Sequence, residues 1–218
     1  SLSNYESGQA LIIVTGKFNA DEVEMRKLIS FIEKGNDVFV SARTISYTAG
    51  DMMNCSVNTS DISSYDNEDI RVVDSLNVSL TTPPFGKKTS YVYPGKRLDA
   101  TFREFDEETT EVLGEDESGR TNFIRLQAGK GNLFLHLAPL AFTNYFLLHK
   151  ENIRYYERAL SVINPSVTKV VWDEYYLNKK FLDEREDPKK GWFTVLMATE
   201  NDNGKKPFQA AFWLLMLL

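Results

Sequence analysis

Cysteine and histidine, which often provide nucleophiles and metal ligands, are scarce in this chain: its 218 residues include one cysteine and two histidines. A single cysteine excludes an internal disulfide framework and a cysteine-rich zinc site. A nucleophile on an α/β sheet usually sits in a turn flanked by glycines. Cys55, within Met-Met-Asn-Cys-Ser-Val-Asn, has no glycine on either side. We therefore expect Cys55 to have a structural role and not to act as a nucleophile.

The two histidines do not suggest a catalytic triad or a metal site. His136 lies in the apolar run Leu133–Leu137, which predicts a histidine with satisfied hydrogen bonds in the core, whereas His149 is expected at the surface. The segment Gly129-Lys130-Gly131 lacks the Gly-x-x-x-x-Gly-Lys-Ser/Thr spacing of a phosphate loop and precedes a strand. It predicts a hairpin turn. We therefore expect no cofactor and no catalytic residues.

Positive charge is also in short supply, because the net charge is -6 and the isoelectric point is about 5.1. The chain has no cluster of lysine and arginine with interleaved aromatic residues, so we expect no nucleic-acid partner. The acidic stretch Glu104–Glu117 favours a solvated face. A divalent-cation site is the alternative, although the spacing does not match the Asp-x-Asp-x-Asp-Gly pattern of a calcium loop.

A continuous apolar run of about 20 residues, the length that spans a bilayer, is missing as well. The longest apolar stretch is Phe208–Leu218, with no charge after Lys206. One interpretation is an amphipathic C-terminal helix that packs on the core or on a partner. The other, which the uninterrupted run from Ala210 favours, is the first turns of a transmembrane helix. Because Ser1 is an unusual start, we expect the chain to be a fragment.

Residues 10–42 predict a strand, a helix and a second strand. Ala10–Thr15 is β-branched and ends at Gly16, and Asp37–Ala42 is similar. The helix is expected over about 20–34, with Asn19 or Asp21 as its N-cap and Gly35-Asn36 at its C-terminus. Its predicted inner face comprises Val23, Leu28, Phe31 and Ile32. Such a unit requires two parallel strands.

Residues 123–176 predict a hairpin that ends before Pro139, a helix, and a final core strand, Lys169–Tyr176, parallel to Leu133–Leu137. The expected apolar stripe of the helix is Glu151, Ile153, Tyr156, Ala159 and Leu160. Open α/β sheets bind ligands at the carboxyl ends of their strands. We therefore predict a crevice there, although for Asp173 and Glu174 themselves the residues favour a structural role, such as capping or hydrogen bonding across the sheet end. The crevice would be lined by Ser41, Arg43, Pro139, Thr143, Asn144, Asp173 and Glu174.

The middle of the chain is rich in Ser, Thr, Asn and Asp, and it predicts an inserted antiparallel β region over the edge of the α/β sheet. The short strands expected there are Ile70–Asp74, Leu76–Leu80, Ser90–Tyr93, Thr101–Phe105 and Glu111–Leu113. The predicted organisation is one α/β domain over residues 1–200, with the insertion at about 44–121. Residues 201–218 are expected to be a linker and the start of a transmembrane helix.

Two groups of residues resemble a bacterial membrane-protein family known as domain of unknown function 4350. The first is Asn19-Ala-Asp-Glu-Val-Glu followed by Leu-Ile-Ser-Phe-Ile-Glu-Lys-Gly-Asn-Asp-Val-Phe-Val-Ser-Ala over residues 28–42. The second combines Gly129-Lys-Gly, His-Leu-Ala-Pro-Leu-Ala-Phe-Thr-Asn-Tyr-Phe-Leu-Leu over 136–148, Glu151-Asn152, and Val-Val-Trp-Asp-Glu-Tyr-Tyr over 170–176. Together they cover about half of the chain.

The resemblance implies a flavodoxin-like parallel sheet flanked by helices, related to the class I glutamine amidotransferase-like fold but without its triad. It also implies a domain on the periplasmic side of the bacterial inner membrane, held between two transmembrane helices. Neighbouring MoxR-type ATPases and von Willebrand A-type proteins suggest protein partners in an envelope complex.

Three functions remain open from the sequence. The first is a non-enzymatic, membrane-anchored binding or assembly module that takes a small polar ligand, a glycan or a partner segment. The second is a hydrolase that uses Asp173 and Glu174. The third is a structural connector in a membrane complex.

Overall fold

The computed structural model describes residues 6–59, 75–81, 84–86, 89–94 and 100–179. The chain divides into two compact units, residues 1–177 and 178–218. Almost all of the described residues belong to the first unit, which is the subject of the following sections.

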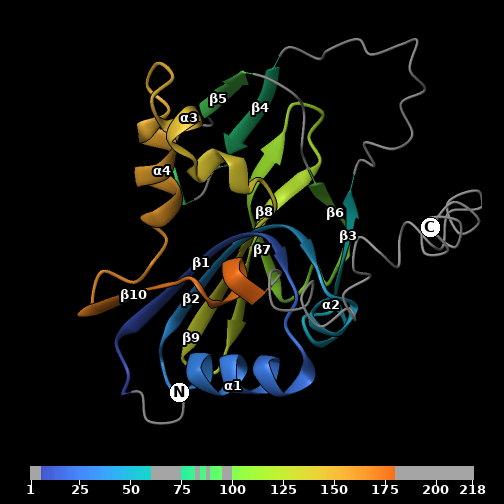
Figure 1. The fold of residues 1–218 in the computed structure, drawn as a ribbon, viewed down its shortest axis with the longest axis vertical. Helices are drawn as coiled ribbons and strands as arrows, with labels where there is room; N and C mark the ends of the chain where they lie inside the picture. The colour runs from blue at the N-terminus through green and yellow to red at the C-terminus, as the bar shows by residue number, and fades with distance from the viewer. Residues whose placement is uncertain (1–5, 60–74, 82–83, 87–88, 95–99, 180–218) are drawn as a thin grey trace, which may run out of the picture. The chain divides into compact units, whose positions relative to one another are not determined.

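The first unit is built on a mixed sheet whose strand order is β10-β1-β2-β9-β8-β7-β4-β5 (Figure 1). Strands β1 (Gln9–Phe18), β2 (Asp37–Ile45), β9 (Gly131–His136) and β10 (Lys169–Asp173) form its parallel half. The two predicted crossover units are therefore confirmed. Because β1 and β2 separate β9 from β10, the second crossover passes over two strands rather than joining neighbours.

The other half of the sheet is antiparallel and comes largely from the predicted insertion. It contains β4 (Ser75–Leu80), β5 (Thr89–Pro94), β7 (Thr110–Asp116) and β8 (Thr121–Ala128). The insertion thus extends the same sheet, which corrects the prediction that it lies over the edge. Strands β3 (Cys55–Thr59) and β6 (Ala100–Phe105) pair separately in a two-stranded sheet. The strand predicted at Ile70–Asp74 lies outside the described residues.

Helix α1 (Glu22–Glu33) covers one face of the parallel half (Figure 1). Asp21 is its N-cap, as one of the two alternatives predicted, and its side chain accepts from the Glu24 amide in a capping box. Val23, which was predicted on the inner face, is 60% exposed. Met25 is buried there instead. The other predicted inner residues, Leu28, Phe31 and Ile32, are buried as expected.

The opposite face is covered by the 3-10 helix η3 (Pro139–Phe142), α3 (Asn144–Leu147) and α4 (Ile153–Leu160). The inner residues of α4 are Tyr155 and Ala159, whereas Ile153 is 45% exposed. The predicted stripe was wrong at Glu151, which precedes the helix, and at Ile153, whereas Tyr156 is half-buried and its ring packs against Phe142. Positive φ at Lys150 marks the break that separates α4 from α3.

Two predictions about strands also require correction. β1 continues through Gly16 to Phe18, so the glycine does not end the strand. β10 is an end strand of the sheet rather than a core strand, and Val170 and Trp172 are 59% and 48% exposed. It stops at Asp173, and a short helix follows over 175–179.

Within the described part of the chain, no helix combines the length and the apolar character needed to cross a membrane. The apolar stretch from Phe208 lies outside the described residues.

Candidate functional site

A chain of three polar side chains crosses the core at the level where β9 ends. The register places Ser41 on β2 opposite His136 on β9. Ser41 Oγ lies 2.8 Å from His136 Nδ1, and Tyr155 Oη lies 2.7 Å from His136 Nε2. All three residues are fully buried. One ring nitrogen donates and the other accepts, so the imidazole is satisfied in its neutral form. This confirms the prediction for His136.

The surroundings of His136 favour the neutral form. Aromatic rings of Phe39, Phe123 and Phe142 pack around the imidazole. Burial lowers the pKa of His136 from its ordinary 6.5 to about 3, and it raises the pKa of the Tyr155 hydroxyl. The Ser41–His136–Tyr155 network therefore stabilises the contact between the sheet and α4 without reaching solvent.

The predicted crevice residues are divided between the two faces of the sheet. Ser41 follows Phe39 at a spacing of two and shares the α4 face, whereas Asp173 follows Val171, which packs against the α1 cluster. Ser41 is closed inside the core by His136. These two residues therefore do not line one crevice, and the prediction is corrected at Ser41.

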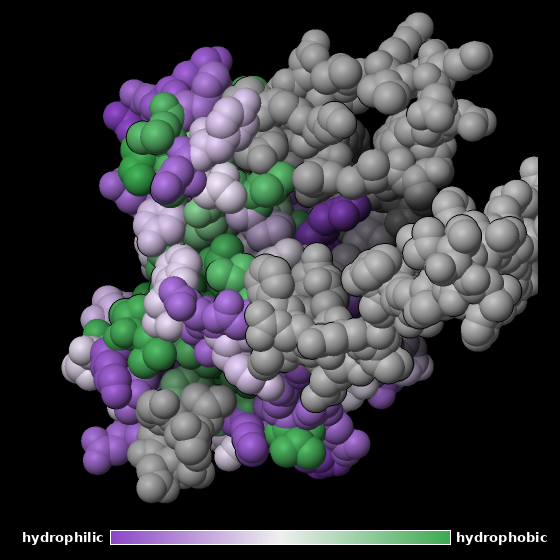
Figure 2. Space-filling view, viewed as in Figure 1, coloured by the Kyte–Doolittle hydropathy of each residue, from purple (hydrophilic) through white to green (hydrophobic). Residues whose placement is uncertain are grey.

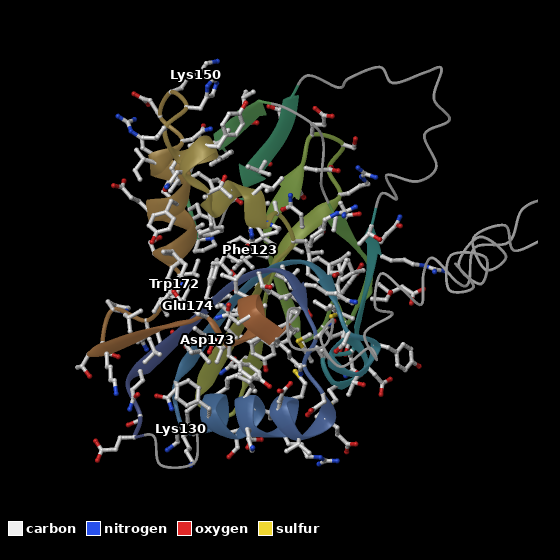
Figure 3. All side chains as sticks on the ribbon, viewed as in Figure 1. Phe123, Lys130, Lys150, Trp172, Asp173 and Glu174 are labelled. Atoms are coloured by element: carbon white, nitrogen blue, oxygen red, sulfur yellow. The ribbon has the colours of Figure 1, made fainter. Side chains whose placement is uncertain are left out.

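Asp173 and Glu174, both labelled in Figure 3, have different surroundings. Asp173 is half-buried, accepts a 3.4 Å hydrogen bond from the Tyr176 amide, and has its pKa raised mainly by burial. Glu174 is exposed just after the strand. The neighbouring Tyr175 hydroxyl donates to Glu24 on α1 at 2.8 Å. This arrangement matches the alternative in which the acids cap the end of the sheet.

The remaining predicted residues lie around the turn after β9. Pro139 is buried in η3, and the Thr143 hydroxyl donates to the Leu140 carbonyl at 2.7 Å. Asn144 is exposed at the start of α3, and Arg43 is half-buried near the end of β2. None of these residues lines the pocket described next.

A pocket of about 480 Å³ lies elsewhere, between α2 (Tyr47–Met52), β3 and β6. The Ser46 side chain caps α2 by accepting from the Ala49 amide at 3.1 Å. Gly50 lets the helix approach β3 closely, because a Cβ there would lie 2.7 Å from the Cys55 carbonyl oxygen. The lining residues are Ile45, Ser46, Tyr47, Gly50, Asp51, Asn54, Cys55, Ser56, Val57 and Glu104.

The lining chemistry of this pocket is acidic and polar. Ser56 and Glu104 are cross-strand neighbours beside a β-bulge. The Ser56 hydroxyl oxygen is buried and has no hydrogen-bond partner among the described residues. Among the described lining residues, Asp51 and Glu104 carry charge and none is basic. Glu104 also forms an exposed ion pair with Arg103 at 3.9 Å.

An aromatic side chain and a thiol complete the lining. Tyr47 is 89% exposed, so its ring is open to a ligand at the mouth. Cys55 is 8% exposed, and burial raises the pKa of its thiol from 9.0 to about 12. The thiol is therefore protonated at neutral pH, as expected of a structural cysteine. In the described part of the chain, no three His, Cys, Asp or Glu residues are placed to hold a metal ion.

These observations define an α/β unit with a mixed sheet, a polar network sealed in its core and an acidic pocket beside its two-stranded sheet. Residues 1–160 match the family model described as "Domain of unknown function (DUF4350)", so the chain belongs to this family. The resemblance in the sequence is confirmed at the level of the family.

Solved structures share parts of this architecture at low sequence identity. The "mmIFT52 N-terminal domain" has a TM-score of 0.50 and 13% identity over 70% of this chain and 75% of that chain. A β-galactosidase from Bacillus circulans sp. alkalophilus has a TM-score of 0.43 and 13% identity over 72% of this chain and 23% of that chain. The exo-β-1,4-mannosidase Op5Man5 from Opitutaceae bacterium strain TAV5 has a TM-score of 0.39 and 12% identity over 70% of this chain.

The chain spans 23% of the length of each of these two glycosidases. At this identity the similarity to the mmIFT52 domain concerns the fold alone. A comparison with curated proteins gave no match.

Proposed function

We propose that this domain is a non-catalytic binding module whose ligand site is the pocket between α2, β3 and β6. The observation that carries the proposal is the buried Ser56 hydroxyl, which lines the pocket and lacks a partner among the described residues. An unsatisfied buried hydroxyl costs about 1–3 kcal/mol. A ligand that displaces the atoms covering the Ser56 hydroxyl and hydrogen-bonds to it would recover that cost, so the pocket favours a polar occupant.

The ligand is a small molecule that carries hydroxyl groups and an ammonium group, as an amino sugar does. Asp51 and Glu104 supply two negative charges, and these charges among the described lining residues favour a cation over an anion. The exposed ring of Tyr47 offers a face for a cation or for the apolar face of a sugar. Asn54 adds an amide beside these groups.

Support for a non-catalytic role comes from the three side chains best suited to nucleophilic or acid–base chemistry. Ser41 and His136 are bonded to each other inside the core, and the thiol of Cys55 is held protonated. A hydrolase built on Asp173 and Glu174 has less support, because one carboxylate caps the following helix and the other is exposed.

The cellular setting belongs to the same proposal. We place the domain on the periplasmic side of a bacterial inner membrane, tethered by the uncharged stretch that begins after Lys206, with protein partners in an envelope complex. We also propose that its parallel half is of the flavodoxin-like or glutamine amidotransferase-like kind, since helices cover both of its faces. Fractionation of cells that express the native protein, with protease treatment of spheroplasts, tests the location.

Calorimetric titration of the protein with glucosamine tests the binding site. Glucosamine is expected to bind more tightly than glucose or N-acetylglucosamine, which lack its charge. Glu104→Gln and Asp51→Asn are each expected to weaken binding about tenfold, a change equivalent to about 1.4 kcal/mol. Lysine, as a second ammonium probe, separates recognition of the charge from recognition of the sugar hydroxyls.

Glu107→Gln is the matched control, because Glu107 is an exposed acid that follows β6 and does not line the pocket. It should leave the affinity unchanged. Equal affinity for glucose and glucosamine, or the absence of binding by both, would overturn the ligand assignment.

A further inference from the structure

Strand β10 ends the eight-stranded sheet and pairs with β1 along one edge. Natural proteins commonly protect such end strands with proline, bulges or inward-pointing charges. β10 contains no proline, and its pairing with β1 runs without a bulge over all five residues. Two large apolar side chains, Val170 and Trp172, are 59% and 48% exposed. Its charges, Lys169 and Asp173, stand only at its two ends, so the three central residues present an apolar edge that can pair with another chain.

Apolar surface continues around the strand. Figure 2 shows hydrophobic residues gathered on the left of the molecule, at the height where Figure 1 places β10. Tyr175 and Leu177, in the helix that follows the strand, are 49% and 51% exposed. The apolar side chains thus extend along both β10 and its C-terminal continuation.

The sequence of β10 is complementary to itself. Its five residues are Lys-Val-Val-Trp-Asp. Antiparallel pairing with a second copy, centred on Val171, places each Lys169 opposite an Asp173 and each Val170 opposite a Trp172. Shifting the register by one residue in either direction places one charged residue of β10 opposite an apolar residue of the partner strand. The other charged residue then lies beyond the end of the partner's β10. One register thus satisfies both the charges and the apolar side chains.

We propose that two copies of this chain associate through β10, antiparallel and centred on Val171, so that the sheet continues across a two-fold axis. The contact is isologous, because each strand presents the same edge to the other. Main-chain hydrogen bonds provide the contact, and the paired charges fix its register. This interface is independent of the pocket beside α2 and of any ligand bound there.

Sedimentation of the whole chain over a range of concentrations tests the proposal. The expected result is a reversible monomer–dimer equilibrium. Lys169→Glu places like charges opposite each other and should weaken the dimer at least tenfold. The exchange Lys169→Glu with Asp173→Lys restores opposite charges and should recover most of the affinity. Lys27→Glu is the matched control, because this substitution makes the same change of charge at an exposed position on α1, away from β10.

A cross-link provides a second test that does not depend on the capping role of Asp173. Cys55 is the one cysteine of the chain, so Cys55→Ser with Val171→Cys leaves one thiol at the proposed axis. A short bis-maleimide should couple two copies of this variant, and it should not couple Cys55→Ser with Val23→Cys, whose thiol lies on α1. A chain that remains monomeric, or a dimer that Lys169→Glu leaves unchanged and that does not cross-link at residue 171, would overturn the proposal.

Discussion

The Tyr155 hydroxyl lies 2.7 Å from His136 Nε2, and this contact joins α4 to β9 inside the core. A second contact, 2.8 Å between His136 Nδ1 and Ser41 Oγ, extends this network to β2. The network occupies the place where open α/β sheets commonly bind ligands. The carboxyl end of β9 is therefore packed against α4, and the proposed ligand pocket lies beside α2.

Removing the Tyr155 hydroxyl is expected to destabilise the protein. Tyr155→Phe leaves a buried ring nitrogen of His136 without its partner, which costs about 1–3 kcal/mol. Denaturation by urea measures the free energy of unfolding. Tyr145→Phe, which alters an exposed ring on α3, is the control and should change stability by less than about 0.5 kcal/mol. Equal effects of the two variants would contradict the structural role of the network.

Burial of His136 also predicts how stability depends on pH. The pKa of His136 is lowered to about 3 in the folded protein, whereas the unfolded chain has an ordinary value near 6.5. Between these values the unfolded state binds one more proton than the folded state. Stability is therefore lost as the pH falls from about 6.5 towards 3, by about 1.4 kcal/mol per pH unit. Above pH 6.5 this contribution is constant.

The measurement compares the wild type with His136→Gln by urea denaturation at several pH values. Other titrating groups contribute to both proteins, so the difference between the two curves isolates His136. Parallel curves would show that His136 titrates in the folded protein as it does in the unfolded chain, against the burial described here.

Gly131 is expected to tolerate no side chain. A Cβ at this position would overlap the carbonyl oxygens of Asn36 and Ile32, where the end of α1 approaches the start of β9. Because these are backbone atoms, they cannot rotate away, and Gly131→Ala should cost more than about 3 kcal/mol. Thermal denaturation measures the loss. Gly16→Ala is the matched control, because its Cβ would have no neighbour within 4 Å.

Cys55 is expected to react slowly with thiol reagents. At pH 8 a thiol with a pKa of about 12 is almost entirely protonated, so native Cys55 should react about a thousandfold more slowly than the same residue in urea-unfolded protein. Modification by DTNB, followed by absorbance, measures both rates. Rapid reaction of the native protein would contradict the burial of this residue.

The local patterns of the sequence predict much of the fold for clear physical reasons. Asp21 and Glu24 at the start of α1, and Gly35 with positive φ at its end, define the helix between two parallel strands. The apolar run that contains His136 correctly predicted its burial. Ser41 was expected near the end of its strand, but β2 continues to Ile45, and the Ser41 side chain points into the core, where it contacts His136.

The pocket was not predicted, because it depends on pairing between distant segments. Ser56 and Glu104 meet only when β3 pairs with β6, across an insertion with no regular hydrophobic period. The weak alternation of polar residues over 55–59 gives no sign that Ser56 lacks a partner. The error at Lys169–Tyr176 has a related cause, since β-branched and aromatic residues suit an end strand as well as a core strand.

Chemical-shift mapping of a glucosamine titration tests the central claim most directly, because it reports where the ligand binds. The account predicts shifts at Ser56, Glu104 and Tyr47, around the pocket beside α2, with the signals of Ser41 and Thr143 unchanged. Shifts confined to Ser41, Thr143 and Asn144 would place the site at the carboxyl ends of the parallel strands and would contradict it.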